Sequence, residues 1–174
     1  MRFNPGCASR FFNFPVASIT DQIVPLDSIW GSRAKEIEQK LMDLNTWQGR
    51  MNLLQEWLLK VKLETSPSPS LSYFAWAWEN APFLSVEKIA ETVGVTRQHL
   101  RRIFLEHSGL TPKDFIQISR VHRLTKLGPS GLSSPEMGFY DQSHLIHQFK
   151  KYTGLTPGAY FRTTGKEPSL SLRL

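Results

Sequence analysis

The chain contains an internal repeat, and this repeat constrains the fold more than any other feature. Residues 96–115 read TRQHLRRIFLEHSGLTPKDF, and residues 141–160 read DQSHLIHQFKKYTGLTPGAY. The two copies align without a gap and share seven of twenty residues. The shared residues are His99, Leu100, Phe104 and 109–112 in the first copy, and His144, Leu145, Phe149 and 154–157 in the second. We therefore expect two copies of one structural unit.

Each copy predicts a helix, a glycine stop and a second helix. Thr96 and Asp141 are good N-caps, because a side-chain oxygen can accept a hydrogen bond from a free backbone N–H group at a helix start. Gly109 and Gly154 suit the left-handed turn that ends a helix, and the Thr-Pro pair that follows suits the start of the next one. The helix of the first copy has one face to bury, formed by Leu100, Ile103, Phe104 and His107, and an otherwise basic exposed side.

The residues before the first copy complete a helix-turn-helix. Residues 84–95 read LSVEKIAETVGV, with a cap at Ser85 and a glycine stop at Gly94. The apolar stripe of this short helix consists of Val86, Ile89, Ala90 and Val93. A short helix, a tight turn containing glycine and a second helix form the layout of a helix-turn-helix. The second helix of such a motif enters the major groove of DNA by its N-terminal end.

The pair of motifs closely resembles the DNA-binding domain of the AraC/XylS transcription regulators. The matching residues cover about 71–162 and include IA before VGV, then RQHLRRIF, GLTP, and GF followed by DQSHLIHQFKKYTGLTPGAYFR. The resemblance implies a mainly α fold with tandem helix-turn-helix motifs joined by a long connecting helix over residues 113–127. It implies that the protein is a sequence-specific DNA-binding regulator of transcription, with double-stranded DNA as its partner.

The resemblance also implies which side chains meet DNA. In the first copy, Gln98, Arg101 and Arg102 occupy positions that commonly face base edges, with Arg97 and His99 nearer the phosphates. The DNA-binding positions expected in the second copy are Gln142, Ser143, His144, His147 and Lys150. Sequence-independent affinity is expected from Lys88, Arg120, Lys150 and Lys151. For Arg120 and Arg123, contact with phosphates and simple solvation both stay open.

The second motif is shorter than the first. Nine residues separate Leu84 from Gly94, whereas five separate Leu132 from Gly138. Pro135 leaves only two residues before the second glycine, too few to close the first turns of a helix. The supporting helix of the second motif is therefore expected not to form fully, which leaves the second recognition helix poorly braced. Arg101 and Arg102 are also replaced there by Ile146 and His147, so we expect DNA to be read mainly through the first motif.

The remaining chain divides by composition and pattern. We expect a partial N-terminal sensor and dimerisation segment over residues 1–64, a Ser/Pro linker over 65–70, the DNA-binding domain over 71–165 and a flexible tail over 166–174. Residues 2–6, 20–21 and 25–31 are similar to the end of the sensor domain in a subset of the family. The resemblance implies a shortened regulator that begins within that domain, lacks its earlier strands and does not sense a small molecule in the usual way.

Three further helices are expected before residue 84. Residues 32–44 and 46–63 predict an antiparallel pair whose apolar faces pack either within the segment or against a second copy, as a homodimer through residues 32–63. Both alternatives stay open. A third helix over residues 71–80 carries four aromatic residues, which are expected to pack on the helix-turn-helix; a stacking platform for single strands is the alternative. The aromatic residues are Tyr73, Phe74, Trp76 and Trp78.

Charge and composition favour a DNA-binding protein. Residues 1–83 hold eight basic and eight acidic side chains, whereas residues 84–174 hold thirteen basic and seven acidic ones. Such asymmetry is typical of a nucleic-acid-binding domain joined to a neutral partner. Cys7 is the only cysteine, which excludes an intramolecular disulfide and a cysteine-based zinc site. No run is apolar and long enough for a membrane span, so a cytoplasmic protein is expected.

The residues give little support to an enzyme. No catalytic constellation or phosphate-binding loop is present, and no cofactor is expected. The five histidines are interpreted as DNA contacts or packing residues rather than as metal ligands.

The alternative to a DNA reader is an interaction protein without DNA activity, which would pair through residues 32–63 with a full-length relative, or an inactive relic. The retained block from Arg97 to Arg102 favours DNA binding. RNA polymerase is a further expected partner if the protein is an activator; the operator, the effector and the direction of regulation stay open.

Overall fold

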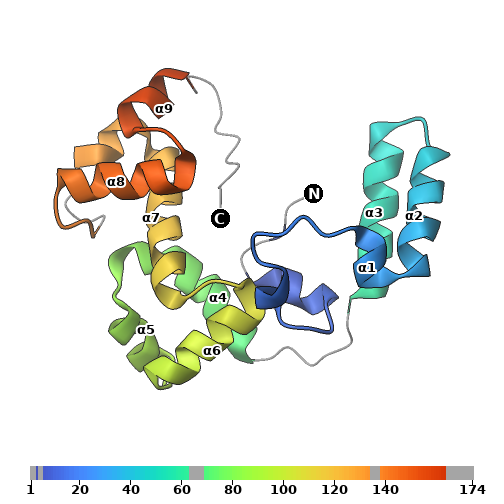
Figure 1. Cartoon of the computed structure of the whole chain (residues 1–174), viewed down its shortest axis with the longest axis horizontal. Helices are drawn as coiled ribbons and strands as arrows, with labels where there is room; N and C mark the ends of the chain where they lie inside the picture. Colours follow the sequence, from blue (N-terminus) through green and yellow to red (C-terminus); the bar gives the residue numbers. More distant parts are fainter. Residues whose placement is uncertain (1–2, 4–5, 63–68, 134–137, 164–174) are drawn as a thin grey trace.

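The protein, seen in a computed structural model that describes residues 3, 6–62, 69–133 and 138–163, is mainly α-helical. Within those ranges every regular element is a helix (Figure 1), and the expected fold class is confirmed. The α-helices are α1 (Leu26–Trp30), α2 (Ser32–Met42), α3 (Trp47–Val61), α4 (Pro69–Asn80), α5 (Val86–Thr92), α6 (Arg97–Ser108), α7 (Pro112–Leu127), α8 (Gln142–Thr153) and α9 (Pro157–Thr163). The 3₁₀ helices are η1 (Cys7–Phe11), η2 (Val16–Ile19), η3 (Ala81–Phe83) and η4 (Gly128–Ser133).

The repeated unit forms as its residues predict. Thr96 Oγ1 accepts a hydrogen bond of 3.2 Å from the His99 backbone N, and Asp141 Oδ1 accepts one of 2.7 Å from the His144 backbone N. Gly109, which follows α6, and Gly154, which follows α8, both adopt left-handed conformations, with φ of 72° and 80°. Because caps and glycine stops fix both ends, α6 and α8 are the same twelve residues long.

The first core lies between α4, α5, α6 and the beginning of α7. Phe74, Phe104 and Phe115 are buried with their ring centroids 4.7–5.9 Å apart. Trp78 packs edge-on against Phe115 at 5.5 Å. The aromatic residues of α4 that the structure describes thus belong to the core, and a stacking platform for single strands is not supported.

The second core lies between α7, α8 and α9. Its buried members are Ile118, Val121 and Leu124 from α7, Leu145, Phe149 and Tyr152 from α8, and Tyr160 from α9. Figure 1 shows α7 running between the two groups of helices, and α7 supplies buried side chains to both cores. The expected connecting helix is therefore present.

The residues expected to form the second supporting helix lie mostly outside the described ranges. After α7 the chain forms η4, and residues 134–137, which include Pro135, lie outside the described residues. Leu132 and Phe139 pack against the second core. Phe139 also contacts α8 itself, because its ring lies 5.7 Å from the ring of His144.

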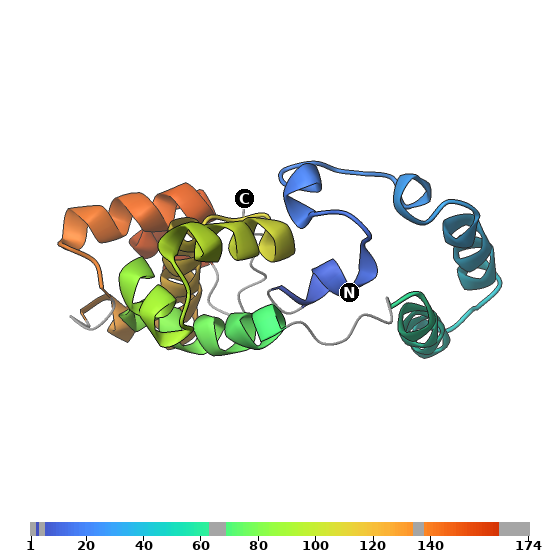
Figure 2. The same cartoon turned by 90° about the horizontal axis from the view of Figure 1, so that it is seen from below.

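The N-terminal segment has two parts, a helical pair and a stretch that packs on α6. As expected, α2 and α3 pair as a helical hairpin, and Figures 1 and 2 show this pair at the end of the molecule away from α8. In contrast, η1 and η2 pack on α6. Thr20 Oγ1 donates a 3.3 Å hydrogen bond to the Gly109 carbonyl, and Ser9 Oγ lies 3.0 Å from His107 Nδ1.

The hairpin leaves part of its apolar surface uncovered. Met42, Trp47 and Leu59 are largely exposed, although Ile37 and Leu58 are buried. Part of the apolar surface of the pair is thus packed within the segment, and part of it faces solvent. None of the described helices has the length and apolar character that a membrane crossing requires.

Replacing Phe104 with alanine tests the first core. The Phe104 side chain is 0% exposed, so its truncation should reduce the free energy of unfolding by about 3–5 kcal/mol. Urea unfolding followed by circular dichroism measures the change. Ile23→Ala, at a fully exposed position outside the proposed dimer surface, is the control and should change stability by less than about 0.5 kcal/mol. Equal effects of the two substitutions would contradict the packing described.

Candidate nucleic-acid interface

The helix α6 has a buried face and a basic exposed face. Leu100, Ile103 and Phe104 are buried in the first core. Every side chain predicted to meet DNA in the first motif is exposed. These side chains are Arg97, Gln98, His99, Arg101 and Arg102. The buried face fixes α6 in place, and the opposite face is free to meet a ligand.

The support behind α6 comes from α5. Ser85 caps α5 by accepting a 3.2 Å hydrogen bond from the Lys88 backbone N, and Gly94 makes the turn with φ of 71°. Ile89 and Ala90 are buried against α6, where the small alanine permits a close approach of the two helices. The first helix-turn-helix is thus complete.

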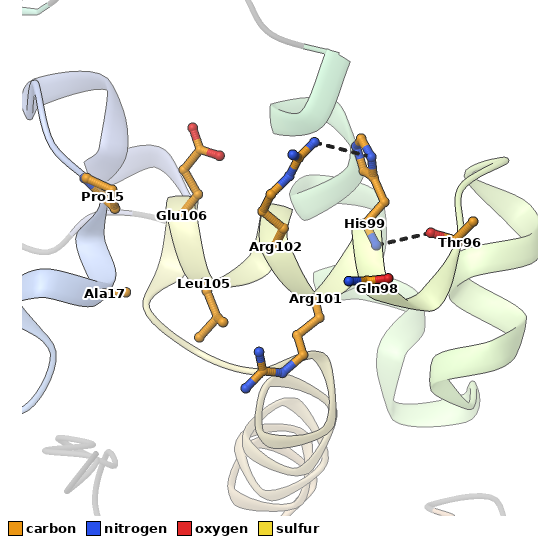
Figure 3. Close-up of a pocket in the computed structure, with 9 residues that line it drawn as sticks. All are labelled: Pro15, Ala17, Thr96, Gln98, His99, Arg101, Arg102, Leu105 and Glu106. Carbon is orange, nitrogen blue, oxygen red and sulfur yellow. Dashed lines mark hydrogen bonds between the residues drawn. The ribbon is translucent and has the colours of Figure 1, made fainter.

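The exposed face of α6 borders an open hollow of about 610 Å³. In Figure 3, Arg101 and Arg102 extend in diverging directions from α6, and Gln98 lies nearer the beginning of the helix, beside His99. Pro15 and Ala17 line the hollow near the Glu106 end of the helix. No local pattern predicts this contact, because the N-terminal segment and α6 are far apart along the chain.

Three side chains of this face, those of Arg97, His99 and Arg102, have partners on the protein. Arg97 Nη1 lies 3.1 Å from Glu87 Oε1, and both side chains are mostly exposed. Arg102 Nη2 lies 3.4 Å from His99 Nδ1. Hydrogen bonds from its own backbone, from Arg97 and from Ser85 lower the pKa of Glu87, so this carboxylate is charged at neutral pH. Any phosphate near Arg97 therefore competes with Glu87 for this guanidinium.

The corresponding face of α8 is less basic. Gln142, Ser143, His147 and Lys150 are exposed as expected, and Ile146 stands where α6 has Arg101. His144 differs from this group because it is half-buried.

Local contacts hold the His144 ring. Its Nδ1 accepts a 3.3 Å hydrogen bond from the Tyr140 backbone N, and the ring lies 5.7 Å from that of Phe139. The structure thus brings the other predicted residues of α8 to one exposed surface and engages His144 locally.

Arg120 does not have the exposed position that both expectations for it, phosphate contact and solvation, require. Its side chain is half-buried, and its Nε donates a 3.0 Å hydrogen bond to the Pro82 carbonyl. It is therefore neither a simply solvated side chain nor a free phosphate contact.

Other basic residues near the interface have local partners. Arg123 is exposed and lies over the Phe83 ring at 4.8 Å. Lys88 forms a 2.9 Å ion pair with Glu91, and Lys151 lies 3.9 Å from Asp114. Because these ion pairs are exposed, they are weak and leave both lysines able to approach a phosphate.

The candidate interface offers mainly hydrogen-bond donors. Within the part of the chain that the structure describes, no three His, Cys, Asp or Glu side chains lie close enough together to hold a metal ion. Cys7 is an exposed free thiol. The polar side chains of the candidate interface are donors suited to phosphates and base edges.

Comparison with known proteins gives a family for this region. The family described as a helix-turn-helix domain matches residues 89–163, which span α5 from Ile89 to the end of α9. An uncharacterised HTH-type transcriptional regulator of Escherichia coli (strain K12), YidL, is 32% identical over 90 residues, covering 49% of this chain and 30% of the relative. The HTH-type transcriptional regulator GlxA of Rhizobium meliloti (strain 1021) is 35% identical over 82 residues, covering 44% of this chain and 25% of the relative.

The matched part of the chain thus spans less than a third of the length of either curated relative. No solved structure matches the chain significantly. The matched residues include the recognition helix of the first motif, the connecting helix and α8, which are the parts that carry the repeat. Residues 89–163 therefore belong to the helix-turn-helix family of the AraC/XylS transcription regulators.

Proposed function

We propose that the protein is a sequence-specific DNA-binding transcription regulator that reads DNA mainly through α6. The observation that carries this proposal is the exposed group of Gln98, Arg101 and Arg102 on a helix whose opposite face is fully buried. A recognition helix needs this combination, because its reading side chains must be free and its backbone must be held.

The chemistry of the three side chains suits base readout. Arginine can donate two hydrogen bonds to the O6 and N7 atoms of guanine, and glutamine can pair with the N6 and N7 atoms of adenine. Each such pair discriminates against a wrong base by about 1–3 kcal/mol. Arg97 and His99 lie toward the beginning of α6 and are assigned to phosphates, with Glu87 released when DNA binds.

The second motif has a supporting role in this proposal. Ile146 can contact the methyl group of a thymine but cannot donate a hydrogen bond to guanine. Gln142, Ser143, His147 and Lys150 remain able to contact the DNA backbone. We therefore assign to α8 affinity that depends little on sequence.

Further partners are part of the same proposal. The exposed Met42, Trp47 and Leu59 support a homodimer through residues 32–63. Contact with RNA polymerase applies if the regulator activates transcription, and DNA binding places the protein in the compartment that holds the DNA. An interaction protein without DNA activity is not favoured, because the basic face of α6 and its buried support are both intact.

Selection from random DNA tests the proposed function. The purified chain is mixed with a pool of random duplexes at about 150 mM salt, where non-specific binding is weak, and the retained duplexes are sequenced. Enrichment of a short motif that spans one major-groove half-site is expected. Retention of no sequence above background would contradict the proposal.

Arg101→Ala should relax the sequence preference. Loss of a bidentate contact should reduce discrimination at one or two positions of the enriched site by about 1–3 kcal/mol, with little change at the others. Binding to a panel of single-base variants measures this. Arg33→Ala in α2 removes the same charge far from α6 and is the control. Full discrimination by the Arg101 variant would show that α6 is placed wrongly.

Lys150→Ala should weaken binding to all sequences by the same factor. A lysine that contacts a phosphate releases about one counterion, so the slope of log affinity against log salt should fall by about 1. Affinities for a cognate and an unrelated duplex at several salt concentrations give both quantities. A change in sequence preference without a change in slope would be inconsistent with a backbone contact.

Glu87→Gln should strengthen binding to DNA. The substitution frees Arg97 from its ion pair, and the gain should be no more than several-fold because an exposed ion pair is weak. Since the pKa of Glu87 is lowered, the wild-type ion pair persists at neutral pH and below the usual pKa of a glutamate, so the gain should be present at pH 7. Glu36→Gln, which makes the same charge change in α2, should have less effect. Equal gains would indicate a general charge effect.

A further inference from the structure

Arg120 lies where the two halves of the DNA-binding region meet. On α7, Phe115 and Ile116 belong to the first core, and Ile118 and Val121 belong to the second. Arg120 is therefore on the segment of α7 that serves the second core, yet its side chain reaches back to the first motif. The side chain contacts residues that precede α5 and residues that precede α8.

The guanidinium holds the chain that leads into α5. Nε donates a 3.0 Å hydrogen bond to the Pro82 carbonyl in η3, and Nη2 donates one of 3.5 Å to the Leu84 carbonyl. Pro82 is itself buried, and Leu84 packs against the first core. Two donors of one planar group thus contact the main chain directly before the supporting helix of the first motif.

The same guanidinium contacts the chain that leads into α8. Gly138 has φ of 68°, and a Cβ atom added there would lie 2.6 Å from Arg120 Cζ and 2.9 Å from its Nε. The Phe139 ring centroid lies 6.0 Å from Arg120 Cζ, and this ring contacts His144 on α8. The side chain is therefore packed between the segment that precedes α5 and the segment that precedes α8.

Within the described ranges, Arg120 is held by hydrogen bonds to the main chain rather than by an ion pair. We call its contacts with the segments before α5 and before α8 the Arg120 joint. Among the described residues no carboxylate forms an ion pair with Arg120, and its acceptors are main-chain carbonyls. Burial lowers the pKa of Arg120, but a guanidinium stays charged at any physiological pH. A planar cation with several fixed donors is suited to holding two backbone segments in one geometry.

We propose that Arg120 is a positioning residue that sets how α6 and α8 lie relative to each other. The relevance of this joint to DNA readout rests on the proposed function. The joint itself is a property of the free protein and can be tested without DNA.

Pulsed electron paramagnetic resonance measures the joint directly. In the full chain with Cys7→Ser, spin labels on cysteines at Glu106 and Lys150 report the distance between α6 and α8. The parent protein should give one narrow distance distribution, and Arg120→Ala should broaden or shift it. Lys126→Ala, which removes a positive charge from an exposed position on the same helix, is the control and should leave it unchanged. An unchanged distribution in Arg120→Ala would overturn the proposal.

Two further variants separate the planar group from its charge and from folding. Arg120→Lys keeps the charge but loses the paired donors, so it should resemble Arg120→Ala; full restoration by lysine would overturn the assignment to the guanidinium. Gly138→Ala keeps the arginine in the sequence but should push its guanidinium aside, because an added Cβ would collide with it. The same broadening of the distance distribution is therefore expected. If Arg120→Ala loses its helical circular dichroism signal, these two variants decide, and a parent-like distribution in both would overturn the proposal.

DNA protection connects the joint to function. On an enriched duplex, Arg120→Ala should lose hydroxyl-radical protection on the α8 side and keep it on the α6 side. Equal loss on both sides, or no loss on either, would overturn a positioning role. If the parent protein protects no DNA at all, the proposed function fails, whereas the distance distributions still decide the role of Arg120.

Discussion

The DNA-binding region depends on one helix that is shared by two hydrophobic cores. The beginning of α7 lends Phe115 and Ile116 to the core under α6, and its later turns lend Val121 and Leu124 to the core under α8. An α-helix of this length is stiff, since each turn is closed by backbone hydrogen bonds. The placement of the two recognition helices is therefore set by where each packs on α7. A side chain that contacts the segments leading into both motifs, such as Arg120, can adjust that placement.

The division of α6 into two faces connects packing with recognition. Burial of Leu100, Ile103 and Phe104 supplies the free energy that holds the helix, and none of the side chains assigned to DNA is needed for this packing. The basic face can therefore carry several arginines without burying an unpaired charge. In α8 the buried side is built in the same way, with Leu145 and Phe149 in the core, but the exposed face has lost its arginines. The two motifs thus keep a common support and differ in what they can read.

Local signals in the sequence predict the helices, whereas contacts between distant residues leave no such signal. The caps at Thr96 and Asp141, the glycine stops and the apolar spacing predict α6, α7 and α8, because each signal acts within one or two turns. From the sequence alone, Arg120 is expected to contact a phosphate or to be solvated. Its acceptor, the Pro82 carbonyl, is 38 residues away, and no local spacing of residues indicates such a contact. The contact of Thr20 with Gly109 spans 89 residues and is hidden for the same reason.

The candidate site shows the same division. Helical spacing predicts which positions of α6 and α8 are exposed, because it depends only on the geometry of one helix. The half-buried position of His144 depends instead on its contacts with Tyr140 and Phe139. Helical spacing does not predict these contacts, because both residues lie before α8.

Site-directed cleavage of DNA tests the central claim, that α6 enters the major groove, most directly. A chelated iron is attached to a cysteine at Gln98 in a protein with Cys7→Ser, which removes the exposed native thiol. On a duplex recovered by selection, we predict cleavage confined to a few base pairs around the enriched half-site, and none from the same probe placed at Arg33 in α2. Diffuse cleavage from the Gln98 probe, or an equal pattern from both positions, would contradict this placement of α6.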